Sequence, residues 1–161
     1  MKKMFGRFLA AGLALLMTVA LAACSGGGEA KTVKIEDLAK QLVDGLTWKE
    51  ELMEVTSESV MQNYYQVDMA DVKYWALYRS SSGATAEEIA VFEGTDAEAA
   101  GRIKDAVSTR VEDLKFAFED YVPAEMPKIE NAVVYTSGNY VVLVTNDDDA
   151  AALDMVKKFF A

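Results

Sequence analysis

Residues 95–121 read TDAEAAGRIKDAVSTRVEDLKFAFEDY, the longest regular pattern in the chain. Apolar side chains recur there at every third or fourth position, which predicts one apolar stripe along a helix of about six turns. Residues 95–98 predict a capping box at its start, and Pro123 and Pro127 are expected to stop any helical structure beyond it. The stripe consists of Ala97, Ala100, Ile103, Val107, Val111, Leu114, Phe118 and Tyr121.

Four other segments have the short aliphatic and aromatic pattern of strands. They form two pairs, and each pair is joined by residues typical of tight turns, so two antiparallel hairpins are expected. In the second turn, Gly138 and Asn139 tolerate positive φ. The strands are predicted at residues 72–79, 87–93, 132–136 and 140–145.

The order strand, strand, helix, strand, strand, helix predicts an α+β fold with a four-stranded, mainly antiparallel sheet and helices packed on one face. Helices are expected before the sheet at residues 33–45 and 57–65, while residues 47–55 suit a strand or a helical turn. The opposite face is expected to be open or covered by these N-terminal helices. Gly101 costs the long helix about 1 kcal/mol relative to Ala, and a close approach to the sheet would explain it.

The N-terminus has the pattern of an export signal. Lys2, Lys3 and Arg7 precede an apolar run at residues 8–20. That run is shorter than the about 20 apolar residues needed to span a membrane, so the pattern is typical of a signal peptide.

Residues 21–24 read LAAC and resemble the lipobox of bacterial lipoproteins. The resemblance implies that residues 1–23 are removed and that the Cys24 thiol receives a diacylglycerol, with fatty acyl chains such as palmitate. Two chains anchor a protein stably, and the glycine-rich segment 24–32 is expected to be a flexible tether. The alternative is an ordinary secretory signal cut after Ala23, which leaves a free thiol.

Composition limits the chemistry of the mature chain. The chain from Cys24 onward matches one domain, expected at residues 33–161. Loss of three cations with the signal changes the formal charge from −10 to −13, which makes nucleic acid a poor partner. The sequence contains no histidine, and Cys24 is its one cysteine. The Ser-His-Asp and Cys-His arrangements are therefore excluded, and we expect neither enzyme activity nor a cofactor.

The acidic residues fit no metal or catalytic motif. Residues 146–149 read NDDD. A calcium loop of the EF-hand type requires glycine at its sixth position and glutamate at its twelfth. Counted from Asn146, these positions hold Ala151 and Lys157, so the pattern does not fit. The run instead predicts a helix N-terminus, and we expect no metal. Adjacent acids at 87–88 and 119–120 suit general acid–base roles, but the sequence does not bring them together.

Aromatic residues form the candidate ligand groove. On a strand Tyr74 and Tyr78 share one face, and Trp75 lies on the other. One set is expected in the core, while the other is able to line a groove for a sugar or a peptide. The alternative is that both faces are buried, the second beneath the helices before the sheet. The whole aromatic cluster is Tyr64, Tyr65, Tyr74, Trp75 and Tyr78.

Four stretches resemble one family of small lipoproteins of Gram-positive anaerobes, which carry domain of unknown function 4358. The resemblance covers about residues 33–161 and implies an exported α+β domain on the outer face of the cytoplasmic membrane. It implies no catalytic residue, cofactor or ligand. The stretches are YYQVD at 64–68, AEEIAVF at 86–92, FEDYVP at 118–123 and GNYVV at 138–142.

These features predict a lipid-anchored extracytoplasmic binding or interaction module, with the membrane as one partner through Cys24. The further partner is expected to be an envelope protein or a small ligand of unknown identity. A passive structural or accessory lipoprotein of an envelope complex is the second reading, and a hydrolase using carboxylates alone is the third.

Overall fold

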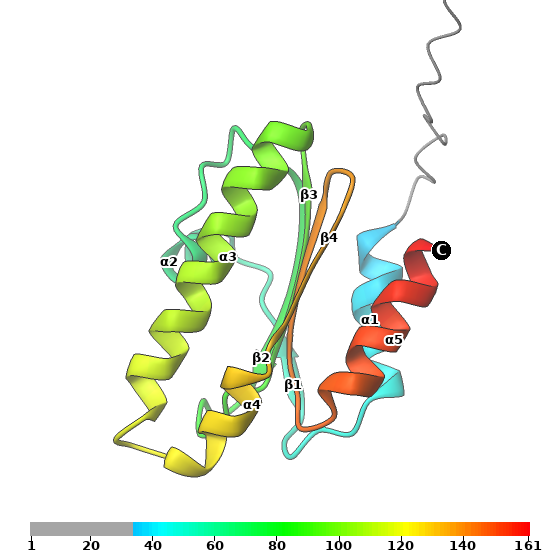
Figure 1. The fold of residues 1–161 in the computed structure, drawn as a ribbon. Helices are drawn as coiled ribbons and strands as arrows, with labels where there is room; N and C mark the ends of the chain where they lie inside the picture. The colour runs from blue at the N-terminus through cyan, green and yellow to red at the C-terminus, as the bar shows by residue number, and fades with distance from the viewer. Residues whose placement is uncertain (1–33) are drawn as a thin grey trace, which may run out of the picture.

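A computed structural model describes residues 34–161 (Figure 1). The predicted signal peptide, Cys24 and the predicted tether lie outside the described residues. The helices are α1 (Ile35–Gly45), α2 (Glu58–Tyr65), α3 (Ala97–Phe118), η1 (Pro123–Glu125), α4 (Met126–Glu130) and α5 (Asp149–Phe160). The strands are β1 (Leu52–Glu54), β2 (Val72–Ser80), β3 (Glu88–Gly94), β4 (Val133–Ser137) and β5 (Tyr140–Thr145).

The strands form one antiparallel sheet in the order β1-β2-β3-β5-β4. The α+β class and the antiparallel sheet are confirmed, but the prediction of four strands is wrong. The fifth strand, β1, pairs Leu52 with Ser80 and Glu54 with Tyr78 at the edge of the sheet. Three residues are too short to show a period of two, so this strand had no pattern of its own.

Helices cover both faces of the sheet. The prediction that α5 shares the face of α3 is wrong, whereas the alternative that an N-terminal helix covers the opposite face is confirmed for α1. In Figure 1, α1 and α5 lie on one side of the sheet, and α2, α3 and α4 lie on the other. Every residue of β3 and β5 is buried, as continuous apolar strands between two layers require. Side chains alternate between the layers: Phe92 packs in the core beneath α3, and Val91 packs in the core beneath α1 and α5.

The long helix runs from Ala97 to Phe118, so it ends before Tyr121, and its cap is Asp96 and not the Thr95 of the predicted capping box. Asp96 caps α3 by accepting a hydrogen bond from the Ala99 N–H at 2.8 Å. The expectation that the prolines stop helical structure beyond α3 is wrong, because Pro123 and Pro127 occupy the first turns of η1 and α4. Proline is tolerated there, since the first N–H groups of a helix have no intrahelical acceptor.

The close approach of helix and sheet occurs at Gly94 and not at Gly101. Gly101 is exposed, and a Cβ built on it would meet nothing within 4 Å. The close approach expected at Gly101 is therefore wrong. It occurs instead at Gly94, the last residue of β3, where a Cβ would lie 2.8 Å from the Ala100 backbone nitrogen. The start of α3 therefore crosses the end of β3 too closely for any side chain at Gly94.

This contrast gives a matched pair of variants. Gly101→Ala is expected to raise the free energy of unfolding by up to about 1 kcal/mol, because alanine restricts the unfolded chain and favours helix. Gly94→Ala is expected to lower it, because the backbone at Ala100 must move. Urea denaturation of both variants checks this. A destabilised Gly101→Ala variant, or an unaffected Gly94→Ala variant, would contradict the packing.

Candidate functional site

Charged side chains are buried at one end of the sheet, where β2 and β5 end and β3 begins. Glu87 and Glu88 are 1% and 2% exposed. They are adjacent in sequence and find different partners: Glu88 binds residues of α2 and α3, and Glu87 binds the loop before β1. Because a buried carboxylate is costly unless it is paired and hydrogen-bonded, both sets of partners are needed. We call this region the charged end.

Glu88 forms a buried ion pair with Arg110 of α3. Arg110 donates from Nε to Oε1 at 3.1 Å and from Nη2 to Oε2 at 2.7 Å, a two-point arrangement with high directional specificity. The Tyr65 hydroxyl of α2 donates to the same Oε1 at 2.5 Å. Burial alone would lower the pKa of Arg110, but the charge and hydrogen bonds of Glu88 raise it. Burial, followed by the Glu88 charge, raises the pKa of Tyr65, so both donors stay protonated.

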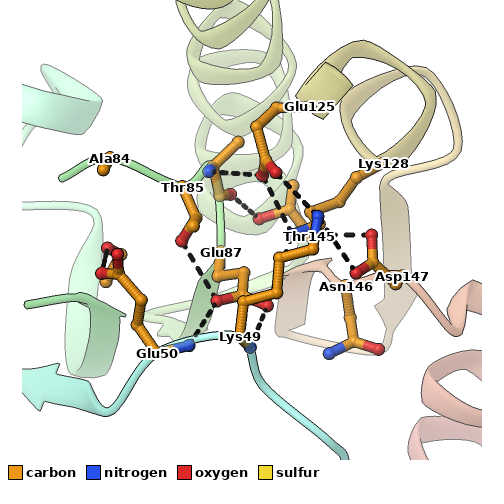
Figure 2. A network of polar contacts seen from close by, with 12 residues as sticks. Lys49, Glu50, Ala84, Thr85, Glu87, Glu125, Lys128, Thr145, Asn146 and Asp147 are labelled. Carbon is orange, nitrogen blue, oxygen red and sulfur yellow. Dashed lines mark hydrogen bonds and ion pairs between the residues drawn. The ribbon is translucent and has the colours of Figure 1, made fainter. Parts of the chain in front are cut away.

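The carboxylate of Glu87 hydrogen-bonds the loop before β1 (Figure 2). Its carboxylate accepts from the backbone N–H groups of Lys49 at 2.8 Å and Glu50 at 3.3 Å, and from the Thr85 hydroxyl at 3.1 Å. Lys128 Nζ lies 3.3 Å from the same group. The side chain is therefore surrounded by donors and is unavailable to a ligand.

Glu125 and Lys128 form the second part of this network (Figure 2). Lys128 Nζ lies 2.9 Å from Glu125 Oε2, and it is buried without a well-directed hydrogen bond. Glu125 also accepts from Lys49 Nζ at 2.9 Å and from the Ala86 N–H at 3.0 Å. Asp147 lies 3.4 Å from Lys49 and 3.6 Å from Lys128 at the surface of the network.

The electrostatics of Glu125 do not suit a general acid. Burial alone would raise its pKa, but hydrogen bonds from Lys49, the Ala86 N–H and Lys128 together lower it to about 2. A general acid must hold a proton near the working pH, so this carboxylate serves as a fixed anion that joins α4 to the loops.

A hollow of about 240 Å³ opens on the α3 side of the charged end. At its wall the guanidinium groups of Arg79 and Arg110 both lie against the Tyr64 ring, 4.3 Å and 4.8 Å from the ring centroid. Arg79 also donates from Nη1 to the Tyr64 hydroxyl. We call this site the arginine hollow. Its other lining residues include Gly83, Thr85 and Glu88, together with Leu114 and Phe118 of α3.

The residues of the predicted groove do not share one site. Trp75 is partly buried against the core beneath α3, and Tyr78 is partly buried against the core beneath α1 and α5. Tyr74 is 54% exposed and lines a separate hollow of about 590 Å³ with Lys34, Lys73 and Glu93. Cys24, the predicted lipid site, lies outside the described residues.

The arginines of the hollow were missed from the sequence, although one left a signal. Arg110 lies three residues after Val107 and four before Leu114, so it belongs to the apolar stripe of α3. A cation within such a stripe indicates a buried partner. Arg79 lies on the same face of β2 as Trp75 and Leu77, because alternate residues of a strand share a face. This alternation does not indicate which face carries a ligand site.

The acidic run at residues 146–149 forms a helix start, as expected. Asp148 caps α5 by accepting from the Ala151 N–H at 2.9 Å. Within residues 34–161, no group of three or more histidine, cysteine or acidic side chains is arranged to hold a metal ion. The helices of this same range are all too short or too polar to cross a membrane.

The fold defines an α+β protein with a five-stranded antiparallel sheet between two helical layers. The family model described as "Domain of unknown function (DUF4358)" matches residues 47–146, and the chain belongs to this family. The match includes the sheet, α3 and the arginine hollow, whereas α1 and α5 lie outside it. No curated protein and no solved structure matches the chain.

The low pKa of Glu125 predicts acid sensitivity. Its folded pKa of about 2 lies below the ordinary value of 4.5, so its stabilising effect is present above about pH 4.5 and is lost as the pH falls toward 2. The loss is of order 3 kcal/mol. Glu125→Gln is expected to flatten the decline of unfolding free energy across this window, measured by urea denaturation. Glu119→Gln, at an exposed acid, is the control, and an equal effect in the two variants would contradict the assignment.

The Glu88–Arg110 pair predicts strong coupling between two substitutions. Arg110→Met leaves a buried carboxylate without its cation and is expected to lower the unfolding free energy by about 3–5 kcal/mol. Adding Glu88→Leu removes that carboxylate and is expected to restore much of the loss. Urea denaturation of the single and double variants measures the coupling. Additive effects would show that the two side chains do not depend on each other.

Proposed function

We propose that the protein is a lipid-anchored extracytoplasmic binding module that takes a small ligand in the arginine hollow. The observation that carries the proposal is Arg79, whose guanidinium lines the hollow without an ion pair to any residue of the described part. The other cations of the charged end, Arg110, Lys49 and Lys128, all contact carboxylates. A binding role accounts for the one cation of the charged end that contacts no carboxylate within residues 34–161.

The position of the hollow supports presentation away from the membrane. The described chain enters α1 beside Tyr74 and Glu93, at the start of β2 and the end of β3. Arg79 lies five residues farther along β2 than Tyr74, which is about 17 Å along a strand. A tether from Cys24 therefore joins the domain at one end of the sheet and leaves the hollow at the other.

The lipid anchor is tested by Cys24→Ala. This variant is expected to lose membrane retention or to keep its signal peptide, because no thiol remains for the diacylglycerol. Fractionation of cells and the mass of the recovered chain measure both outcomes. Normal processing with unchanged membrane retention would contradict the anchor.

The exposed side of the domain is tested with a single new thiol. Ala84→Cys places a cysteine on the exposed turn next to the hollow, while a lipidated Cys24 offers no free thiol. A membrane-impermeant maleimide is expected to label this variant on intact cells and to leave the unsubstituted protein unlabelled. Labelling only after lysis would contradict extracytoplasmic presentation, and labelling of the unsubstituted protein would contradict lipidation.

An accessory role in an envelope complex is the second candidate. Phe116 and Tyr121, near the end of α3, are 82% and 75% exposed, and exposed aromatic side chains are frequent contacts in protein interfaces. Under this reading, replacing both with serine weakens retention of a partner in cells. Under the first reading, the same change leaves ligand binding in the hollow intact.

A further inference from the structure

The guanidinium of Arg79 has one edge satisfied and one edge free. Its Nη1 donates to the Tyr64 hydroxyl, whereas its Nε is buried and has no acceptor among the described residues. A donor left without an acceptor in a buried position costs about 1–3 kcal/mol. An acceptor that reaches this edge would recover that cost.

Arg110 shows how such an edge is used in the same hollow. Its Nε and Nη2 both donate to the two oxygens of Glu88. The equivalent edge of Arg79, formed by Nε and Nη2, has no partner within residues 34–161. The turn beside this edge carries glycine at position 83, where an added Cβ would lie 4.0 Å from Nη2. Glycine at this position therefore adds no side chain of its own to that space.

The charge of the hollow favours a single negative charge on the ligand. Arg79 and Arg110 contribute two positive charges, and Glu88, the cross-strand neighbour of Arg79, contributes one negative charge. Glu87, which also borders the hollow, shares Lys128 with Glu125 and Asp147, so the lining as a whole carries no excess positive charge. Within residues 34–161 Arg79 is the charged residue of the lining that has no ionic partner. A single negative charge matches it, whereas a second would be repelled by the nearby carboxylates.

We propose that the arginine hollow binds the carboxylate group of a small monoanionic ligand through the Nε–Nη2 edge of Arg79. The planar fork of a guanidinium matches the two oxygens of a carboxylate, as Glu88 already demonstrates on Arg110. Arg79 is only partly buried and lines the hollow, and its Nη2 lies beside Gly83 of the same lining. The assignment deepens the proposed binding function by naming the ligand class.

The test uses the full chain in detergent micelles with acetate as the probe. Acetamide is its neutral analogue of the same shape, and inorganic phosphate is the competing oxyanion. Nuclear magnetic resonance follows the Nε–H signal of Arg79 and the backbone N–H of Gly83. Acetate is expected to shift both signals saturably, acetamide to shift neither, and phosphate to bind at least tenfold more weakly. Tighter binding of phosphate, or equal shifts with acetamide, would overturn the assignment.

Three variants distinguish two-point binding by the guanidinium group from attraction by its positive charge alone. Arg79→Gln removes the charge and the fork and is expected to weaken acetate binding at least tenfold. Arg79→Lys keeps the charge and loses the fork, so it is expected to recover only part of the affinity. Lys104→Gln, which removes an exposed cation of α3, is the control and is expected to bind acetate normally. Equal losses in Arg79→Gln and Lys104→Gln would show nonspecific charge attraction and overturn the site.

The two proposals fail separately. If the chain is lipidated and surface-exposed but does not bind acetate, the carboxylate assignment is wrong and the lipid anchor stands. If the chain binds acetate normally but is neither processed nor exposed, the extracytoplasmic placement is wrong and the binding site stands. Circular dichroism of each Arg79 variant distinguishes lost binding from lost folding.

Discussion

The buried carboxylate of Glu88 is the group on which the α3 side of the domain depends. It stands at the first residue of a strand that is covered on both faces, so water cannot solvate it. Arg110 neutralises it from α3, and Tyr65 hydrogen-bonds it from α2. Because these donors have specific directions, the pair sets how both helices lie against the sheet. Apolar packing alone would allow more than one such arrangement.

Glu87 extends the same constraint to the loops. Its carboxylate binds the backbone before β1, and Lys128 links it to Glu125. Segments separated by many residues therefore meet at one end of the sheet through charges that cannot remain unpaired. The family match at residues 47–146 spans nearly all of this network. The layer formed by α1 and α5 lies outside the match, so the charged end belongs to the part of the chain that the family shares.

Most charged side chains of the charged end are paired with opposite charges, so a cation there without an ionic partner indicates a binding site. Arg79 stacks on Tyr64 and stays within the hollow without an ionic partner. The surrounding ions are already paired, so they hold the hollow's wall in place before a ligand arrives, and a preorganised site loses less entropy on binding. The same pairing makes Glu87, Glu88 and Glu125 poor candidates for acid–base chemistry, because each is enclosed by donors.

The main elements could be predicted from local pattern, because helices and strands with one regular period show it in a single segment. The long helix, both hairpins and the capped start of α5 were all found in this way. The edge strand β1 was one of two alternatives for residues 47–55, since its three residues become a strand only by pairing with β2. The continuous apolar character of β3 and β5 is typical of burial on both faces, but the order of elements was interpreted as helices on one face.

The sequence by itself determined the α+β class, the antiparallel hairpins, the family and the absence of histidine. Only the tertiary structure decided which charges meet. Glu88 and Arg110 are separated by 22 positions, and Lys49 and Glu125 by 76. Contacts of this kind depend on how the helices cross the sheet and not on any local period. For the same reason only the tertiary structure shows that Tyr78 packs against a core while Tyr74 is exposed, and that Arg79 lines a hollow.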